Sequence, residues 1–429
     1  MPSARDIALW ALGRVERDGA FASAALASAF SRDPSLDPRD RGLATELTMG
    51  VLRWRGALDA AIAACAPRGI RRLDSSVLSA LRIAAYQIAH LDRVPPAAAI
   101  SAAVDQVRAA RGDRMAGFAS GVLRALERGE HGALALARDL GLSHPAWLVD
   151  VLGRRLPADE VDLALAVNNS PPPTCLRVNV RRATPDAVAE LLTEKAPGVS
   201  VSHGRHVSTC LRVEGLGDPA ANEAHRLGWY SVQDEGAQIV VALCVESVCH
   251  KKGVRALDAC AGRGGKTAAL AEALEPGSAI EAADRSPQKL ERLAADFARL
   301  GLPPARAIAV DLEVGTAGLV PGYDLILLDA PCSGTGVVRR RPDIRWRRSR
   351  ADVLRMADVQ AVLLQKVAPL LEPGGVLVYS VCSITEEEGP GVVRRAPASL
   401  RLVSERTLWP HRDDTDGFFI ATLEDSRLH

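Results

Sequence analysis

Two cysteines stand at the ends of apolar runs in the second half of the chain. Cys332 follows "YDLILLDAP", and Cys382 closes "VLVYSVC". A thiolate is a soft nucleophile that can add to an electron-poor carbon, such as C6 of a pyrimidine, and this addition makes C5 reactive toward an electrophilic methyl group. A second thiol could then assist release of the product. A single cysteine at a strand end is more often a small buried residue, but a pair at one site is harder to explain in that way.

The two thiols can share a site only if the strands that carry them are neighbours. From about residue 236 onward, apolar strands alternate with amphipathic helices, and we expect the strands in "GVRALDACAG", "SAIEAADRS", "ARAIAVDLE", "YDLILLDAP" and "GGVLVYSVCS". This alternation predicts a doubly wound, mainly parallel sheet, because right-handed crossovers connect such strands. Sheets of this kind bind ligands at the carboxyl ends of their strands, where both cysteines fall.

Acidic residues mark the same edge of the predicted sheet. Four strands end in or beside an aspartate: Asp258, Asp284, Asp311 and Asp329. The first runs into the glycine-rich stretch "ACAGRGGKT", and Asp284 lies where nucleotide-binding sheets hold ribose hydroxyls. The stretch lacks the glycine spacing of P-loop nucleotide triphosphatases, so it favours an adenosine cofactor without a triphosphate. The alternative is that these glycines only form a turn.

A basic segment, "RRRPDIRWRRSR" at residues 339–350, contains seven arginines around one tryptophan. Guanidinium groups attract phosphates, and an unstacked base can lie on an indole or an arginine plane. We predict RNA contacts in this segment and in the tripeptide "RVN", by Arg339, Arg340, Arg341, Arg345, Trp346, Arg177 and Asn179. The alternatives are a solvated basic face and an ordinary strand pairing. The acids of "TEEEG", residues 385–389, are interpreted as the start of a helix rather than a catalytic cluster.

The composition is that of a globular protein of two to four domains, with 429 residues of which 48% are hydrophobic and 24% charged. No apolar run is long enough for a membrane span and no signal sequence is seen, so we expect a cytoplasmic protein. The eight cysteines have no CxxC spacing and the nine histidines no HxxxH or HExxH spacing, which predicts neither a disulfide framework nor a metal site.

Charge and the pattern of apolar residues divide the chain into three predicted domains. Residues 1–140 form an all-α domain, because apolar residues recur at three- and four-residue spacing among many alanines. Residues 144–235 form a small α+β module and residues 236–429 the domain with the parallel sheet. The first 130 residues hold 18 Arg and no Lys against 14 acids, whereas the whole chain carries only +1, so any nucleic-acid surface is patchy.

Several motifs resemble those of one known family. "DACAGRGGKT", "DAPCSGTGVVRRRPDIRW", "YSVCSITEEE" and "DGFFIATL" resemble the motif series of the RsmB/Sun (Fmu) family, bacterial ribosomal RNA cytosine-C5 methyltransferases within the NOL/NOP/Sun group. "LATELTMGVLRWRGALD" and "FASGVLRAL" resemble the NusB-like RNA-binding domain joined to these enzymes. The resemblance therefore covers essentially the whole chain and implies a Rossmann-like class I methyltransferase domain at its carboxyl-terminal end.

The resemblance also implies roles for single residues. Cys382 would be the nucleophile, Cys332 the thiol that helps to release the methylated product, and Asp329 a hydrogen-bond partner of the cytosine edge. The family's S-adenosylmethionine site maps to Cys260, Ala261, Gly262, Arg263, Gly264, Gly265, Lys266, Asp284, Asp311 and Asp329. The chain departs from the family at Gly262 and Arg263, where Ala-Pro is common, which leaves the shape of the loop open. It departs also at Val381, where Thr is frequent.

The resulting hypothesis is a monomeric methyltransferase that forms 5-methylcytosine in small-subunit ribosomal RNA. One alternative is a transfer RNA cytosine methyltransferase, since the thiol chemistry is the same. A DNA cytosine methyltransferase is disfavoured, because there the Pro-Cys thiol attacks and no second strand-end thiol is expected. An alternative from another class is a non-catalytic RNA-binding assembly factor in which the NusB-like domain is the working part and the sheet is a silent scaffold.

Overall fold

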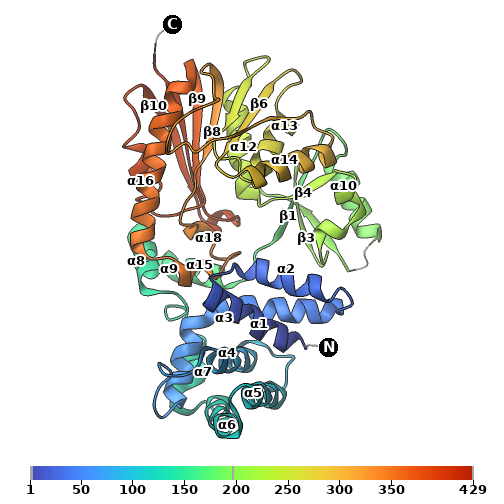
Figure 1. The fold of residues 1–429 in the computed structure, drawn as a ribbon, viewed down its shortest axis with the longest axis vertical. Coiled ribbons are helices and arrows are strands. Elements are labelled where there is room, and N and C mark those ends of the chain that lie inside the picture. Colours follow the sequence, from blue (N-terminus) through green and yellow to red (C-terminus); the bar gives the residue numbers. More distant parts are fainter. Residues whose placement is uncertain (1–2, 196–197, 428–429) are drawn as a thin grey trace. The chain divides into compact units, whose positions relative to one another are not determined.

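The protein forms two compact units in a computed structural model that describes residues 3–195 and 198–427. The first unit comprises residues 1–171 and 338–349, and the second comprises residues 172–337 and 350–429. Figure 1 shows the helices of the first unit and the two sheets of the second. The units divide the chain at other points than the sequence predicts, because the distant segment 338–349 packs with the amino-terminal helices.

The first unit is built of helices, as the apolar spacing predicts. The helices are α1 (Ala4–Asp18), α2 (Ala22–Arg32), α3 (Pro38–Cys65), α4 (Ser75–His90), α5 (Pro96–Arg111), α6 (Asp113–Glu127), α7 (Ala133–Ala137), α8 (Ala146–Arg155), α9 (Ala158–Asn169) and α15 (Ile344–Arg347). Side chains cap the starts of three of them, since Ser3 forms a capping box on α1 and Asp37 and Asp74 accept from the first turns of α3 and α4. Their buried alanines and leucines form one core across α1, α3, α4, α5 and α6.

The second unit begins with a small α+β module, which confirms that prediction. Its elements are β1 (Thr174–Val178), α10 (Pro185–Lys195), β2 (Ser200–His203), β3 (Cys210–Glu214), α11 (Glu223–Arg226) and β4 (Tyr230–Val232). The strands form a four-stranded sheet in the order β2-β3-β1-β4, and each neighbouring pair is antiparallel.

A seven-stranded sheet follows, in the order β10-β11-β9-β8-β5-β6-β7. Its strands are β5 (Arg255–Asp258), β6 (Ala279–Asp284), β7 (Arg306–Ala309), β8 (Tyr323–Asp329), β9 (Leu371–Val381), β10 (Leu400–Leu408) and β11 (Phe418–Asp425). The five predicted strands are all present and pair in parallel, so their carboxyl ends share one edge. Strands β10 and β11 were not predicted; they extend the sheet beyond β9 in antiparallel pairing.

Helices cover both faces of this sheet, as expected for a doubly wound fold. The helices are α12 (Glu235–Ser247), α13 (Gly265–Ala273), α14 (Pro287–Leu300), α16 (Arg350–Val367), α17 (Pro390–Val393) and α18 (Pro410–Asp413). Helices α12, α13 and α14 pack on one face, and α16 packs on the other (Figure 1). Helix α17 belongs to the same core cluster as α16. Within the described residues, we find no helix long and apolar enough to cross a membrane.

Candidate active site

The two strand-end thiols meet at the carboxyl edge of the sheet. Cys382 follows β9 directly, and Cys332 lies three residues beyond the end of β8. Because β8 and β9 are parallel neighbours, with Asp329 opposite Ser380, both turns emerge side by side. The two Sγ atoms are 3.2 Å apart, and both cysteines are half-buried and free of any disulfide. The structure therefore brings together the two thiols that the sequence singled out.

The surroundings of Cys332 keep its proton on the sulfur. Its hydrogen bond with Cys382 and its burial, with the negative charges of Glu388 and Asp329, raise the pKa of the Cys332 thiol well above its ordinary value. Cys332 is therefore a thiol at neutral pH. In that form it can donate a hydrogen bond to the sulfur of Cys382 but is not itself ready to attack.

A half-buried ion pair lies beside the thiols. Lys266 Nζ is 2.7 Å from Asp329 Oδ2, and the hydroxyl of Ser380 donates to the other carboxylate oxygen at 2.8 Å. Burial lowers the pKa of Lys266, but attraction to Asp329 and, more weakly, to Cys382 outweighs it and raises the pKa overall. The site thus contains a cation that attracts Cys382, the residue that the family resemblance assigns as nucleophile.

The glycine-rich stretch forms a tight turn from β5 into α13. Gly262 and Gly264 have positive φ angles of 57° and 85°, and Gly264 is the residue before the helix. A Cβ on Gly264 would lie 2.6 Å from the side chain of Leu293, so the turn also packs too closely against α14 for any other residue. Within the predicted site, Ala261 is buried and donates its backbone N–H to Ala283, whereas Arg263 and Gly265 are exposed.

Three of the four strand-end acids gather around this turn. The carboxylates of Asp258, Asp329 and Asp284 all add to the burial that raises the pKa of Cys260. Asp284 accepts from the Gly262 backbone N–H at 2.9 Å. Asp311 differs, because it is exposed, two residues beyond the end of β7, and its carboxylate accepts from the backbone N–H of Glu313.

Comparisons with known proteins show the family to which this chain belongs. Residues 249–424 match the family described as 16S rRNA methyltransferase RsmB/F, residues 2–128 match the NusB family, and residues 144–218 match the RsmF/B-like ferredoxin-like domain. A probable ribosomal RNA small subunit methyltransferase B of Bacillus subtilis is 31% identical over 98% of this chain and 98% of its own length. The ribosomal RNA small subunit methyltransferase B of Pseudomonas putida is 35% identical over 90% of this chain and 91% of its own. This chain belongs to the RsmB/F methyltransferase family.

Solved structures support the same fold. The crystal structure of PH0851 superposes on this RsmB/F family member with a TM-score of 0.82, covers 99% of each chain and is 24% identical in sequence. The crystal structure of NSun6 from Pyrococcus horikoshii covers 66% of this chain with a TM-score of 0.58 at 18% identity. At these identities the likeness concerns the fold alone.

One important residue of the site escaped the sequence analysis of this RsmB/F family member. The interpretation of residues 385–389 as a helix start was wrong for Glu388, because the helix α17 begins only at Pro390 and Glu388 is fully buried in the turn before it. Its carboxylate accepts from Ser333 and from Ser383, the residues that follow the two thiols. Nothing in local spacing distinguishes Glu388 from its neighbours Glu386 and Glu387.

The tripeptide "RVN" has internal partners, so the predicted RNA contacts there are not supported. Arg177 is 4% exposed and forms a two-pronged ion pair with Glu272 at 2.7 and 2.9 Å. It also donates to the backbone carbonyl of Gly265 at 2.8 Å. Asn179 is fully buried and donates to the carbonyls of Gly228 and Leu300. These residues join the α+β module to α13 and α14 rather than facing solvent.

Most of the residues of the basic segment that we predicted to contact RNA pack inside the protein instead. Arg345 is fully buried and donates to the carbonyls of Arg53 and Asn168. Trp346 packs against the helical core and donates to the carbonyl of Leu52 at 2.7 Å. Arg339 is 9% exposed, whereas Arg340 is half-buried and Arg341 exposed. Of the five predicted contacts in this segment, Arg340, Arg341 and the half-buried Trp346 keep surface that is accessible to a ligand in solution.

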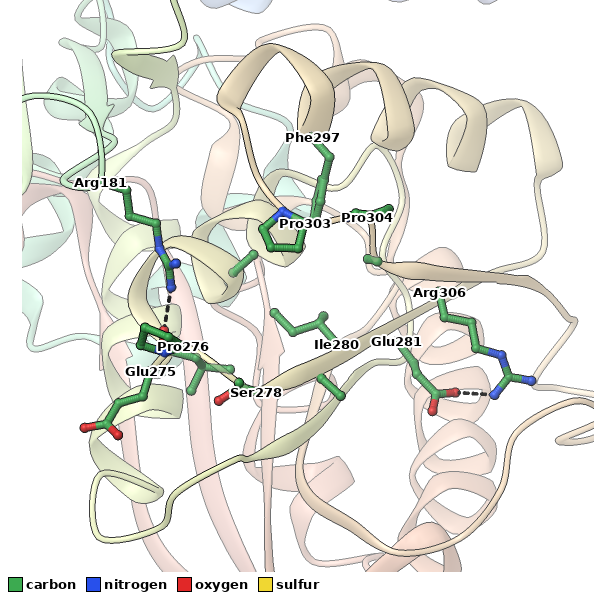
Figure 2. Close-up of a pocket in the computed structure, with 15 residues that line it drawn as sticks. Arg181, Glu275, Pro276, Ser278, Ile280, Glu281, Phe297, Pro303, Pro304 and Arg306 are labelled. Carbon is green, nitrogen blue, oxygen red and sulfur yellow. Dashed lines mark hydrogen bonds and ion pairs between the residues drawn. The ribbon is translucent and has the colours of Figure 1, made fainter.

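A pocket of about 400 Å³ lies elsewhere in the second unit, at the amino ends of β6 and β7. Figure 2 shows Pro303 and Pro304 between Arg181 on one side and Arg306 on the other. Arg181 donates to the backbone carbonyl of Leu274, and Arg306 pairs with Glu281. Neither thiol lines it, so this pocket is separate from the candidate active site. No group of three or more His, Cys, Asp or Glu suited to a metal ion occurs among residues 3–195 and 198–427.

Proposed function

We propose that this protein transfers a methyl group from S-adenosylmethionine to C5 of a cytosine in small-subunit ribosomal RNA, through a covalent bond between Cys382 and C6. The observation that carries the proposal is the 3.2 Å separation of the Cys332 and Cys382 sulfurs beside a cation. The curated relatives named as methyltransferase B of the small-subunit ribosomal RNA support the substrate. We propose the cytoplasmic location that the sequence predicts.

The residues at the carboxyl edge fit the proposed cofactor. Asp258 Oδ1 is buried and has no hydrogen-bond partner in the described part of the chain, so an acceptor is left for a ligand. Asp284 lies at the end of the next strand, where an acid can accept from ribose hydroxyls. A Cβ on Gly262 would meet only one atom, at 3.9 Å, which leaves room for close approach. The sulfonium cofactor supplies a transferable methyl group when bound.

The reaction begins with attack by Cys382. Its thiolate adds to C6, and the electrons of the C5–C6 double bond move to C5, which takes the methyl group. Lys266 attracts Cys382, and the carboxylate of Asp329, held by Lys266 and Ser380, accepts from the amino edge of the cytosine in this proposal. C5 then loses its proton to a base, and the C5–C6 double bond re-forms as the bond between Cys382 and C6 breaks.

Cys332 assists the last of these steps. Because its pKa is raised, it carries a proton that can be donated in a hydrogen bond to the departing sulfur of Cys382. Stabilising the leaving thiolate favours expulsion, and the thiol pair returns to its starting state. Attack therefore depends on Cys382 and release depends on Cys332.

Replacing each thiol by alanine tests this division of roles. Cys382→Ala should lower methylation by about a thousandfold or more and abolish any covalent protein–RNA species, since the nucleophile is gone. Cys332→Ala should accumulate a covalent adduct that migrates slowly on a denaturing gel. A Cys382→Ala variant that still forms the adduct would contradict the proposal.

The substrate is tested separately from the chemistry. Bisulfite sequencing of total RNA from a deletion strain should show 5-methylcytosine lost from small-subunit ribosomal RNA and retained in transfer RNA. Loss from transfer RNA instead would favour the transfer RNA methyltransferase. No measurable affinity for S-adenosylmethionine would favour the non-catalytic assembly factor.

A further inference from the structure

The two thiols are followed by serines that share one buried carboxylate. Ser333 donates its backbone N–H to Glu388 Oε1 at 2.7 Å, and its hydroxyl donates to Oε2. Ser383 donates its hydroxyl to Oε2 at 2.6 Å. A single side chain therefore bridges the turn after β8 to the turn after β9, one residue away from each sulfur.

The carboxylate of Glu388 has further donors. Gln360 of α16 donates its amide to Oε1 at 3.0 Å, and the Thr385 hydroxyl lies 3.4 Å from Oε2. Glu388 has no exposed surface, and none of the ion pairs among the described residues includes it. A buried charge without a counter-ion is costly unless hydrogen bonds satisfy it, so these donors are what make Glu388 tolerable at this position.

Glu388 is itself anchored to the sheet. The hydroxyl of Tyr379 in β9 donates to the Glu388 backbone carbonyl at 2.6 Å. The same Gln360 amide donates to the carbonyl of Pro331, the residue before Cys332, at 2.9 Å. The backbone of Glu388 is thus held against β9, and its side chain extends from this position to contact both turns.

We propose that Glu388 is a positioning residue that sets the distance between the sulfurs of Cys332 and Cys382 by holding the residue that follows each of them. The inference rests on the proposed function, in which one thiol attacks and the other assists at the same pyrimidine. A carboxylate suits the task because both of its oxygens accept hydrogen bonds. An amide would accept at its oxygen only, and its NH₂ group would face hydrogen-bond donors. A displacement of about 1 Å between reacting groups can cost about a hundredfold in rate.

Phenylarsine oxide measures the separation of the thiols without RNA or cofactor. Its arsenic(III) atom forms two As–S bonds with a pair of close thiols, and its oxygen leaves as water with the two thiol protons. Cys175 and Cys210 form a second interacting pair, but both are buried, so the arsenical does not reach them in the folded protein. We therefore expect the wild-type protein to bind one equivalent tightly and the Cys382→Ser variant to show only background binding. Glu388→Asp keeps the charge but shortens the reach by one methylene, so its affinity for the arsenical should fall about tenfold or more.

The matched control is Glu386→Gln in the same turn. Glu386 is half-buried and pairs with Arg394 on the surface, so this variant should bind the arsenical as the wild type does. A natively folded Glu388→Asp variant with wild-type affinity would overturn the proposal. If Glu388→Asp does not fold, the double variant Ser333→Ala with Ser383→Ala decides, because it removes the hydroxyl donors of both turns and keeps the carboxylate. Wild-type affinity in that variant would overturn the proposal equally.

A kinetic readout separates positioning from general loss of structure. In Glu388→Asp, kcat for methylation should fall about tenfold or more while the KM values for RNA and S-adenosylmethionine stay near those of the wild type. An equal change in kcat and both KM values would indicate a general structural role instead. If the wild type does not methylate cytosine at all, the proposed function fails while the arsenical result still decides the role of Glu388.

Discussion

Asp258 shows how burial can dominate the charge state of a single residue at this edge. It lies at the end of β5, is 1% exposed and accepts from the Thr267 hydroxyl at 2.7 Å. Burial raises the pKa of Asp258 to about 7, the Thr267 hydrogen bond opposes the rise, and the negative charge of Asp329 adds to it. Without a ligand, Asp258 therefore holds its proton under mildly acidic conditions in which an exposed aspartate has lost it.

This shift predicts a pH dependence of stability that belongs to one side chain. Between the ordinary pKa of 3.8 and the folded pKa of about 7, the unfolded chain is ionised at this position and the folded chain is not. Folding therefore loses stability as pH rises through this interval, by about 1.4 kcal/mol per unit of pKa difference. The Asp258→Asn variant cannot ionise at this position. From about pH 5 to about pH 8, the free energy of unfolding of the wild type should therefore fall by about 2 to 3 kcal/mol more than that of the variant.

Urea unfolding of the protein without ligand, at both pH values, measures the difference. Asp311→Asn is the matched control, since Asp311 is a strand-end aspartate that is exposed. Its curve should follow the wild type. Parallel pH curves for Asp258→Asn and the wild type would show that burial does not shift this carboxyl group as described.

At the scale of elements, the sequence predicts the strands that form the site because each strand ends in or beside a recognisable residue. β5, β6 and β8 end in aspartates, and β9 ends directly before a cysteine, so alternation and end residues place all four on one edge. β10 has no such residue at its end. Its residues 401–406 are exposed, so it also lacks the apolar run that indicates a strand. Its pairing with β11 depends on tertiary contacts, which the local sequence does not show.

Arg177 shows a different limit of prediction at this scale. An arginine beside a strand suggests a solvent-facing contact, yet its ion pair partner Glu272 lies on α13, almost a hundred residues away in the chain. Each side chain of the pair is 5% exposed. A buried pair of this kind fixes α13, and hence the glycine-rich turn that precedes it, against β1 of the α+β module.

The pair makes a clear prediction about stability. Arg177→Met leaves the carboxylate of Glu272 buried without a cation and should lower the free energy of unfolding by about 3 to 5 kcal/mol. The double variant Arg177→Met with Glu272→Met removes both charges and should recover most of this loss, because two methionines fill a similar volume. Urea denaturation of the wild type, both single variants and the double variant forms the cycle. A double variant as unstable as the sum of the single variants would exclude coupling between the two residues.

At the scale of the whole molecule, the chain passes between the two compact units three times. It leaves the first unit after residue 171, returns for residues 338–349 and leaves it again. The returning segment begins only six residues after Cys332, so one continuous stretch contains both a thiol of the candidate active site and part of the helical core. The sequence could not predict this, because the basic residues of the segment suggest a solvated surface and the partners of Arg345 lie in α9 and α3.

Trp346 allows the two interpretations of this segment to be separated. It packs on the helical core, donates to the carbonyl of Leu52, and lies under the guanidinium of Arg55 at 5.3 Å from the ring centre. Gly56 makes the contact possible, since a Cβ there would lie 3.0 Å from the indole and 2.1 Å from the carbonyl oxygen of Leu142. The indole is thus expected to stabilise α3 rather than to stack on a base.

Trp346→Ala should therefore lower the stability of the first unit by about 2 kcal/mol, less than for a fully buried tryptophan because this one is only half-buried. Hydrogen exchange of the α3 backbone amides around Leu52 should become faster, since their packing partner and one carbonyl's donor are lost. Arg341→Ala is the control from the same segment: its exposed side chain should leave α3 exchange unchanged. If Trp346→Ala weakened RNA binding while α3 exchanged as in the wild type, the indole would be an RNA contact, as the sequence alone suggested, and its packing against α3 would be incidental.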